Sequence, residues 1–164
     1  GADNLWRYLN NSGEMAVNSW ADNDYYVDAN GIMVADKWMQ IVSPYSRDSQ
    51  TYWFYFGSSG KVTKDTWKKI DGKSYYFDAD GIMQTGWQNV NGNWYYLNSK
   101  GAMQTGWLLK EGKYYFLNTD GTMAYGWVNS QGSWYYFQKP DGDMLTNAYA
   151  PDGRYVNAEG VLIQ

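Results

Sequence analysis

GWQNVNGNWYYLNSKGAMQT, residues 86–105, decides the fold, because the chain repeats this stretch twice more. The second copy is GWLLKEGKYYFLNTDGTMAY at 106–125. The third is GWVNSQGSWYYFQKPDGDMLT at 126–146, with one inserted residue. Self-similarity at a fixed period is typical of arrays in which each unit buries one face against its neighbours. The sequence therefore predicts a solenoid built from units of about 20 residues.

Each unit contains the signature of a tight hairpin. Asn91-Gly92 suits the two central positions of a type I′ turn, since both positions need a positive φ. A two-residue loop at this place pairs Trp87 with Tyr96, and the pleat then puts Trp87, Trp94 and Tyr96 on one face of the hairpin. The predicted fold class is all-β, a row of short stacked hairpins.

The rest of the chain reads as weaker copies of the same unit, so residues 1–164 are expected to form a single repeat module. Residues 67–148 hold the regular repeats, and residues 1–66 hold degenerate ones with an enlarged hairpin loop at 39–52. Residues 149–164 form a truncated copy. Terminal units of arrays are usually atypical because they cap the core.

Composition excludes several function classes. Aromatic residues make up 20% of the chain, with ten Trp and seventeen Tyr, which is more aromatic surface than a small core needs. The net charge of −4 argues against nucleic acid and is compatible with a cationic partner. No apolar run is long enough to insert into a membrane.

The chain lacks the usual chemistry of an enzyme or of a metal protein. It contains no Cys and no His, which removes thiolate ligands, the commonest metal ligand and the usual general base. Asp78, Asp80, Asp120 and Asp141 stand at turn positions, where Asp favours the turn itself. We therefore expect no catalytic activity, no metal and no cofactor.

The repeated elements Gly-Trp, a glycine turn, Trp/Tyr-Tyr-Tyr/Phe and Gly-x-Met resemble the choline-binding repeats of Gram-positive cell-surface proteins, as in the pneumococcal autolysin amidase. This resemblance covers 67–148 closely and the rest loosely. It implies a left-handed β-solenoid of hairpins in a secreted protein. The module would hold choline or phosphocholine of teichoic and lipoteichoic acids and so anchor a protein to the cell wall. Some members dimerise through their C-terminal hairpins, so a homodimer is an open expectation.

The resemblance also implies where choline would bind. Each site lies between consecutive hairpins and takes the Trp of Gly-Trp, the aromatic residue seven positions later, and the second Tyr of the next unit's aromatic run. Transferred residue by residue, the sites are Trp87, Trp94 and Phe116; Trp107, Tyr114 and Tyr136; and Trp127, Trp134 and Tyr155. Methionines such as Met123 are expected in the core, bordering the floor of the sites.

Other aromatic residues are expected to bind choline less well or not at all. One weaker site is Trp38, Trp53 and Tyr76, where the enlarged loop separates the first two residues. Another is Trp67 with Tyr96, where Ser74 replaces an aromatic wall. Binding is thus expected mainly in the C-terminal half. A packing role on the opposite strand face is expected for Tyr75, Tyr95, Tyr115 and Tyr135.

Two other functions remain open from the sequence. Glucan-binding repeats share the same pattern, because stacked aromatic residues also bind sugar rings. An adhesin is the second alternative, in which the degenerate N-terminal repeats and the loop at 39–52 would contact a protein partner. Elution by choline would favour choline binding, and elution by dextran would favour glucan binding.

Overall fold

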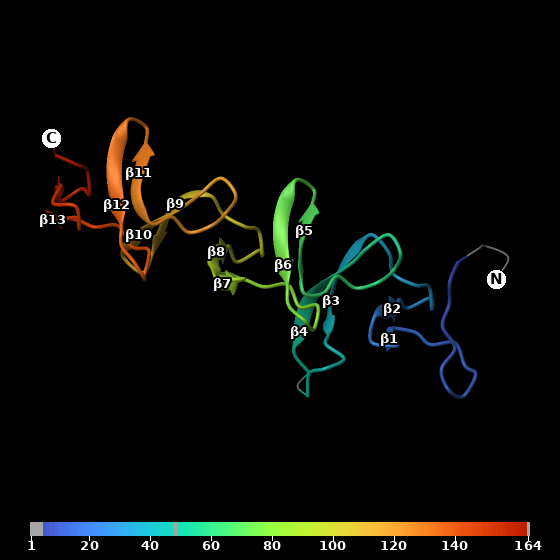
Figure 1. Cartoon of the computed structure of the whole chain (residues 1–164). Coiled ribbons are helices and arrows are strands. Elements are labelled where there is room, and N and C mark those ends of the chain that lie inside the picture. The colour runs from blue at the N-terminus through green and yellow to red at the C-terminus, as the bar shows by residue number, and fades with distance from the viewer. Residues whose placement is uncertain (1–4, 48, 164) are drawn as a thin grey trace. The chain divides into compact units, whose positions relative to one another are not determined.

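The computed structural model describes residues 5–47 and 49–163 and forms two compact units, Gly1–Gln84 and Thr85–Gln164. In both units every regular element is a β-strand, and consecutive strands pair as antiparallel hairpins (Figure 1). The expected all-β array of hairpins is confirmed. Across the described ranges, no helix is long and apolar enough to span a membrane.

The hairpins of the two units differ in regularity. The strands of the first unit are β1 Ser19–Ala21, β2 Tyr25–Val27, β3 Lys37–Val42, β4 Thr51–Phe56, β5 Thr66–Ile70 and β6 Lys73–Phe77. Those of the second are β7 Gly86–Val90, β8 Asn93–Leu97, β9 Gly106–Lys110, β10 Lys113–Leu117, β11 Gly126–Ser130, β12 Ser133–Phe137, β13 Ala148–Tyr149 and β14 Tyr155–Val156. The division into degenerate repeats at 1–66, regular repeats at 67–148 and a truncated copy at 149–164 stays a prediction.

The hairpin turn has the predicted backbone and register. Asn91 has φ 52° and Gly92 has φ 82°, so both central residues have the positive φ that a type I′ turn requires. Trp87 pairs with Tyr96, and Asn89 pairs with Trp94. Because this register is fixed by a two-residue turn, each hairpin presents its aromatic residues on a defined face.

Each hairpin contributes at least one fully buried side chain to the core. In each hairpin the last residue of the second strand is at most 1% exposed: Val27, Phe56 and Phe77 in the first unit, and Leu97, Leu117, Phe137 and Val156 in the second. Each of these residues bridges to an apolar residue in the following link, as Leu117 does to Met123. Burying such a side chain contributes about 1.5–3 kcal/mol, so the core grows one repeat at a time.

The enlarged tip predicted at 39–52 is smaller than expected. Residues 39–42 continue β3 and pair with β4, where Gln40 lies opposite Trp53 and Val42 lies opposite Thr51. The loop proper is therefore 43–50, of which Asp48 lies outside the described residues. Because the insertion lengthens both strands equally, the register nearer the base of the hairpin is unchanged.

Trp20 belongs to the core of the first unit. Its ring makes edge-to-face contacts with Tyr26 and Phe54, at centroid distances of 5.7 and 5.0 Å. Asp24, at the second-wall position of this short hairpin, accepts a hydrogen bond of 2.8 Å from Lys64, which lowers the pKa of the carboxyl. This hairpin thus contributes packing and an ion pair.

The turn glycines of the second unit allow a methionine of the preceding repeat to approach. Gly142 has φ 77°, and a Cβ at this position would overlap the side chain of Met123. Gly92 has a similar φ of 82°, but nothing lies within 4 Å of the place where its Cβ would be. The two glycines therefore separate backbone strain from side-chain crowding.

We expect Gly142→Ala to destabilise the second unit more than Gly92→Ala does. Both changes impose a positive φ on alanine, at about 1–2 kcal/mol, but Gly142→Ala adds an overlap with Met123 of about 1–3 kcal/mol. Urea unfolding followed by tryptophan fluorescence measures the difference. Equal losses for the two variants would show that Met123 is free to move aside.

Candidate ligand-binding site

The second unit contains an aromatic cluster around Trp87. Trp87 of β7 and Trp94 of β8 lie edge to face with ring centroids 6.5 Å apart. Tyr115 comes from β10 in the next hairpin, and its ring lies 5.0 Å from that of Trp87. Together with Met123, Pro140 and Asp141, these three rings line a pocket of about 230 Å³. We call them the Trp87 cluster.

The third residue of this cluster differs from the sequence expectation. Phe116 was expected to meet Trp87, but it pairs with Trp107 in its own hairpin, at a centroid distance of 5.5 Å. Adjacent residues of a strand point to opposite faces. Tyr115, expected to serve only in packing, is therefore the residue that contacts the preceding hairpin.

The same arrangement recurs around Trp107. The ring of Trp107 lies 6.1 Å from that of Tyr114 and 4.7 Å from that of Tyr135, which comes from β12 of the next hairpin. The expected third residue, Tyr136, lies instead against Trp127 at 5.2 Å. Trp107 also donates an indole hydrogen bond of 3.0 Å to the Ser130 hydroxyl. We call Trp107, Tyr114 and Tyr135 the Trp107 cluster.

The first unit contains an equivalent cluster despite its longer hairpin. Trp38 lies 6.4 Å from Trp53 and 4.9 Å from Tyr75, measured between ring centroids. The unchanged register keeps Trp38 opposite Tyr55, just as Trp87 lies opposite Tyr96. Tyr76, the expected third residue, lies against Trp67 at 5.2 Å. We call Trp38, Trp53 and Tyr75 the Trp38 cluster.

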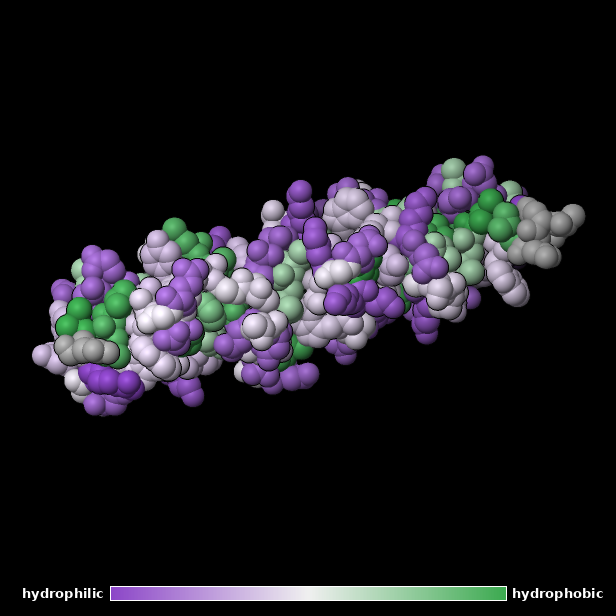
Figure 2. Space-filling model, turned by 90° about the horizontal axis from the view of Figure 1, so that it is seen from above, coloured by the Kyte–Doolittle hydropathy of each residue, from purple (hydrophilic) through white to green (hydrophobic). Residues whose placement is uncertain are grey.

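The second wall of each cluster is the exposed aromatic residue of the second strand, Trp53, Trp94 or Tyr114. A methionine from the link after the next hairpin lies beside it. The backbone N–H of this methionine donates to the carbonyl of the second-wall residue: Met83 to Trp53, Met123 to Trp94, and Met144 to Tyr114, at 2.7–2.8 Å. The second-wall rings are well exposed, at 43% for Trp53 and 45% for Tyr114. On the face seen in Figure 2, white and green residues of intermediate and apolar hydropathy are exposed among the purple hydrophilic ones. Exposed rings next to half-buried tyrosines of the following hairpin are free to contact a ligand.

The expected pair Trp67 and Tyr96 is divided between the two units. In the second unit the ring of Tyr96 lies 5.1 Å from that of Trp87. Trp67 belongs to the first unit, where it packs on Tyr76. A site formed by Trp67 and Tyr96 stays a prediction.

Around Trp127 the third position is occupied by a cation. The Arg154 guanidinium lies over the Trp127 ring, 4.2 Å from its centroid. The expected third residue, Tyr155, instead contacts the ring of Tyr149 at 5.0 Å and donates its hydroxyl to Asn147 at 2.5 Å. We call Trp127, Trp134 and Arg154 the Trp127 cluster.

Asp152 holds this arginine in place. Its carboxylate accepts hydrogen bonds from Arg154 Nε at 2.9 Å and from the Trp127 indole at 2.7 Å. The Arg154 hydrogen bonds first, and then that of Trp127, lower the pKa of Asp152 from 3.8 to about 2. The carboxylate is therefore ionised at any physiological pH, next to a fixed positive charge.

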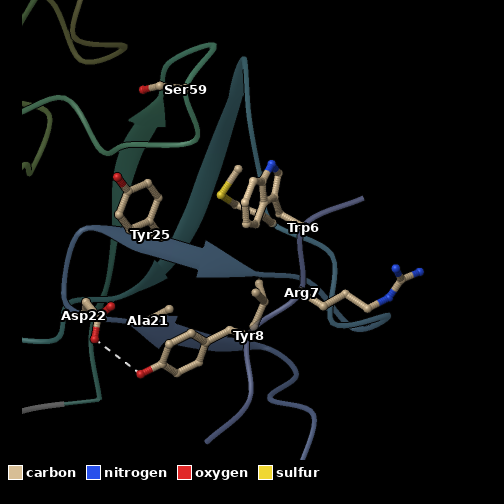
Figure 3. A pocket seen from close by; sticks show the side chains of 9 residues that line it. Trp6, Arg7, Tyr8, Ala21, Asp22, Tyr25 and Ser59 are labelled. Atoms are coloured by element: carbon tan, nitrogen blue, oxygen red, sulfur yellow. Dashed lines mark hydrogen bonds between the residues drawn. The ribbon is translucent and has the colours of Figure 1, made fainter. Parts of the chain in front are cut away.

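The first unit has a further pocket that the sequence analysis did not identify. It encloses about 510 Å³ and is lined by Trp6, Tyr25 and Met33, with Asp22 and Ser59 as polar neighbours. Tyr8 donates its hydroxyl to Asp22 at 3.3 Å (Figure 3). The run Trp6-Arg7-Tyr8-Leu9 was the visible signal, because it matches Trp94-Tyr95-Tyr96-Leu97 position by position.

The site chemistry is that of aromatic faces. Within 5–47 and 49–163, no group of three or more His, Cys, Asp or Glu side chains is placed to hold a metal ion. The clusters around Trp38, Trp87 and Trp107 instead offer three rings each. Such arrangements attract cations through the negative faces of the rings.

Comparisons with known proteins relate the chain to repeats that bind choline and the cell wall. Choline-binding repeats match residues 84–121 and 110–149, and a putative cell wall binding repeat matches 65–83. The chain is 38% identical to choline binding protein F of Streptococcus pneumoniae, with a TM-score of 0.79 over 98% of this chain. It covers 55% of that chain, so it spans about half the length of this relative. The same protein has been crystallised with a peptidoglycan analogue.

Two further relatives are a choline-binding domain and a glucosyltransferase. The choline-binding domain of CbpL from Streptococcus pneumoniae is 31% identical, and the match covers 99% of this chain and 94% of that domain, with a TM-score of 0.66. Glucosyltransferase-S of Streptococcus mutans serotype c (strain ATCC 700610 / UA159) is 31% identical over 97 residues, which is 48% of this chain and 7% of that protein.

The Asp152 carboxyl should titrate well below an ordinary aspartate. Since its folded-state pKa is about 2 against 3.8, its stabilising contribution is complete above pH 4 and is lost as the pH falls through about 2. A carbon-detected NMR titration of the carboxyl checks this, and Arg154→Ala should return the midpoint toward 3.8. A native midpoint near the ordinary value would contradict the observed contacts.

Proposed function

The chain belongs to the choline-binding repeat family, and we propose from this premise that it is a non-catalytic module that binds choline or phosphocholine of bacterial cell-wall polymers. The observation that carries the proposal is the threefold recurrence of one geometry. Around Trp38, Trp87 and Trp107, an aromatic residue of the next hairpin lies 4.7–5.0 Å from the first tryptophan. A second aromatic wall stands at 6.1–6.5 Å.

Aromatic cages suit a trimethylammonium group for a simple reason. This group has no N–H to donate, so ring quadrupoles and methyl contacts must hold it. Each ring contributes about 0.5–1 kcal/mol when exposed and about 2 kcal/mol when desolvated. After the cost of association, one site has a Kd near the millimolar range, for which the binding free energy is about −4 kcal/mol.

Weak sites become effective when several engage one polymer. Linked binding events exceed the single-site affinity by about 10²–10⁴ when the geometry allows simultaneous engagement. Teichoic and lipoteichoic acids that carry many phosphocholine groups are polymers of this kind. The module would thereby hold a protein at the cell surface without a covalent bond.

The proposed site residues are Trp38, Trp53 and Tyr75; Trp87, Trp94 and Tyr115; and Trp107, Tyr114 and Tyr135. The third residues are Tyr75, Tyr115 and Tyr135. From the sequence, their neighbours Tyr76, Phe116 and Tyr136 were expected. One complete cluster lies in the first unit, which supports binding there as well as in the C-terminal half, where most of it was expected from the sequence. The Trp127 cluster is left out because Arg154 fills its third position.

A second candidate function is binding of an α-glucan. It is favoured by the similarity to Glucosyltransferase-S and by the pocket of the first unit. This pocket adds the carboxylate of Asp22 and the hydroxyl of Ser59 to the faces of Trp6 and Tyr25. Apolar rings with a few polar groups are the usual lining of a site for a ligand rich in hydroxyls.

Two further expectations belong to this proposal, one about an attached catalytic module and one about dimerisation. A catalytic module attached to this array would be delivered to the wall by it, and the array itself would contribute binding. A homodimer through the C-terminal hairpins would double the number of sites per particle. Sedimentation velocity with and without choline measures whether the chain dimerises.

We expect Tyr115→Ala to weaken choline binding at the Trp87 cluster and Phe116→Tyr to leave that binding unchanged. Tyr115 supplies the third wall, whereas Phe116 packs on Trp107 in its own hairpin and Tyr keeps its ring. Losing one ring should weaken that site about three- to tenfold, at about 0.5–1.5 kcal/mol. Choline titration followed by the indole N–H resonances of Trp87 and Trp107 resolves the clusters separately.

Elution from a resin distinguishes the two candidate functions. We expect the wild-type protein to bind DEAE-cellulose at a salt concentration that releases an acidic control protein, and to elute with millimolar choline. Dextran should leave it bound. Retention on a dextran resin, lost in Trp6→Ala and kept in Trp87→Ala, would assign glucan to the pocket of the first unit. Absence of retention on the amine resin would refute choline binding.

A further inference from the structure

Arg154 stands at the position that a tyrosine occupies in the other three clusters. Tyr75, Tyr115 and Tyr135 each precede the buried end of their strand by two residues, at Phe77, Leu117 and Phe137. Arg154 precedes Val156 in the same way, and Val156 is fully buried. The guanidinium lies 4.2 Å from the Trp127 centroid, where the tyrosine rings lie 4.7–5.0 Å from theirs.

Trp134 resembles the second walls of the other clusters in its exposure and its backbone hydrogen bond. Trp134 is the second wall, and its ring is 45% exposed, as the ring of Tyr114 is in the Trp107 cluster. Its carbonyl accepts the Leu162 N–H at 2.8 Å, as that of Tyr114 accepts the Met144 N–H. The backbone frame of a cation site is therefore present, with Arg154 in place of the tyrosine and Leu162 in place of the methionine.

We infer that Arg154 is a resident cation, which occupies the cation site of the Trp127 cluster and excludes choline from it. The guanidinium fills the face of Trp127 that a trimethylammonium group would cover. It is held there by the chain, so a free ligand competes with a partner whose effective concentration is of millimolar order. The inference rests on the proposed function, because it names which cluster is closed to the same ligand.

The Asp152 carboxylate makes this occupation persistent. It accepts from Arg154 Nε and from the second guanidinium N–H group, and also from the Trp127 indole. All three donors reach the same oxygen, Oδ2, and the two charge-assisted hydrogen bonds from Arg154 restrain its guanidinium group beside Trp127. A quaternary ammonium group has no N–H and cannot replace these hydrogen bonds, so the guanidinium is the preferred occupant.

Replacing the arginine with tyrosine should open the site. In R154Y the Trp127 cluster would have the aromatic set of the Trp87 cluster, two tryptophans and a tyrosine, with Asp152 left as a neighbouring negative charge. We expect choline to perturb the Trp127 indole resonance of this variant at the same concentration as that of Trp107. In the wild-type protein the Trp127 resonance should need at least about tenfold more choline.

The experiment is a choline chloride titration of the full chain, wild type and R154Y, followed by the tryptophan indole N–H signals. The double variant W127A/R154Y is the control for the added site, and unchanged Trp107 shifts report that R154Y is folded. Equal choline sensitivity of Trp127 and Trp107 in the wild type would overturn the inference. So would a folded R154Y whose Trp127 does not respond while Trp107 does.

The resident cation is also testable without ligand. The guanidinium carbon of Arg154 lies 4.2 Å from the centroid of the Trp127 ring, so we expect the nearby δ-methylene protons to be shifted upfield by its ring current and to return to ordinary values in W127A. Ordinary shifts in the wild type would refute the inference. If neither Trp87 nor Trp107 responds to choline but the ring-current shift is present, the proposed function fails while the occupation of the Trp127 face stands.

Discussion

A hairpin of two five-residue strands cannot bury a core of its own, so each repeat must complete its packing on its neighbour. This packing is provided by a contact between consecutive hairpins. The first tryptophan of one hairpin packs on a side chain of the next. It recurs at Trp38, Trp87 and Trp107 as an edge-to-face contact with tyrosine. Such pairs contribute about 0.5–1.5 kcal/mol beyond the area that they bury.

The same contact forms the proposed ligand site, because a ring that packs by its edge leaves its face uncovered. Trp107 and Trp94 remain 39% and 38% exposed although both belong to aromatic clusters. Stability and binding thus draw on the same side chains. The residues that support folding alone are set apart at the strand ends, where Phe77, Leu117 and Phe137 are at most 1% exposed.

Variation among the repeats changes function while the frame persists. A longer tip leaves the Trp38 cluster intact because β3 and β4 extend together and keep their register. One substitution at the third wall has the opposite result around Trp127, where Arg154 lies on the ring. At Trp20 the loss of the second wall leaves a tryptophan that packs on Phe54 in the core. In the proposed scheme, the side chain at the junction between hairpins determines whether a cluster binds a ligand, serves in packing or is closed.

The sequence by itself determined the repeat, the turn and the register, because a two-residue Asn-Gly loop fixes every pair within its hairpin. It also identified the first and second walls, such as Trp87 and Trp94, which belong to one hairpin. The third wall was decided by tertiary structure. Whether Tyr115 or Phe116 reaches Trp87 depends on which strand face turns toward the preceding hairpin, and no local pairing rule specifies that. Likewise, only the fold brings Arg154, Asp152 and Trp127 together, because the last link of the chain departs from the repeat period.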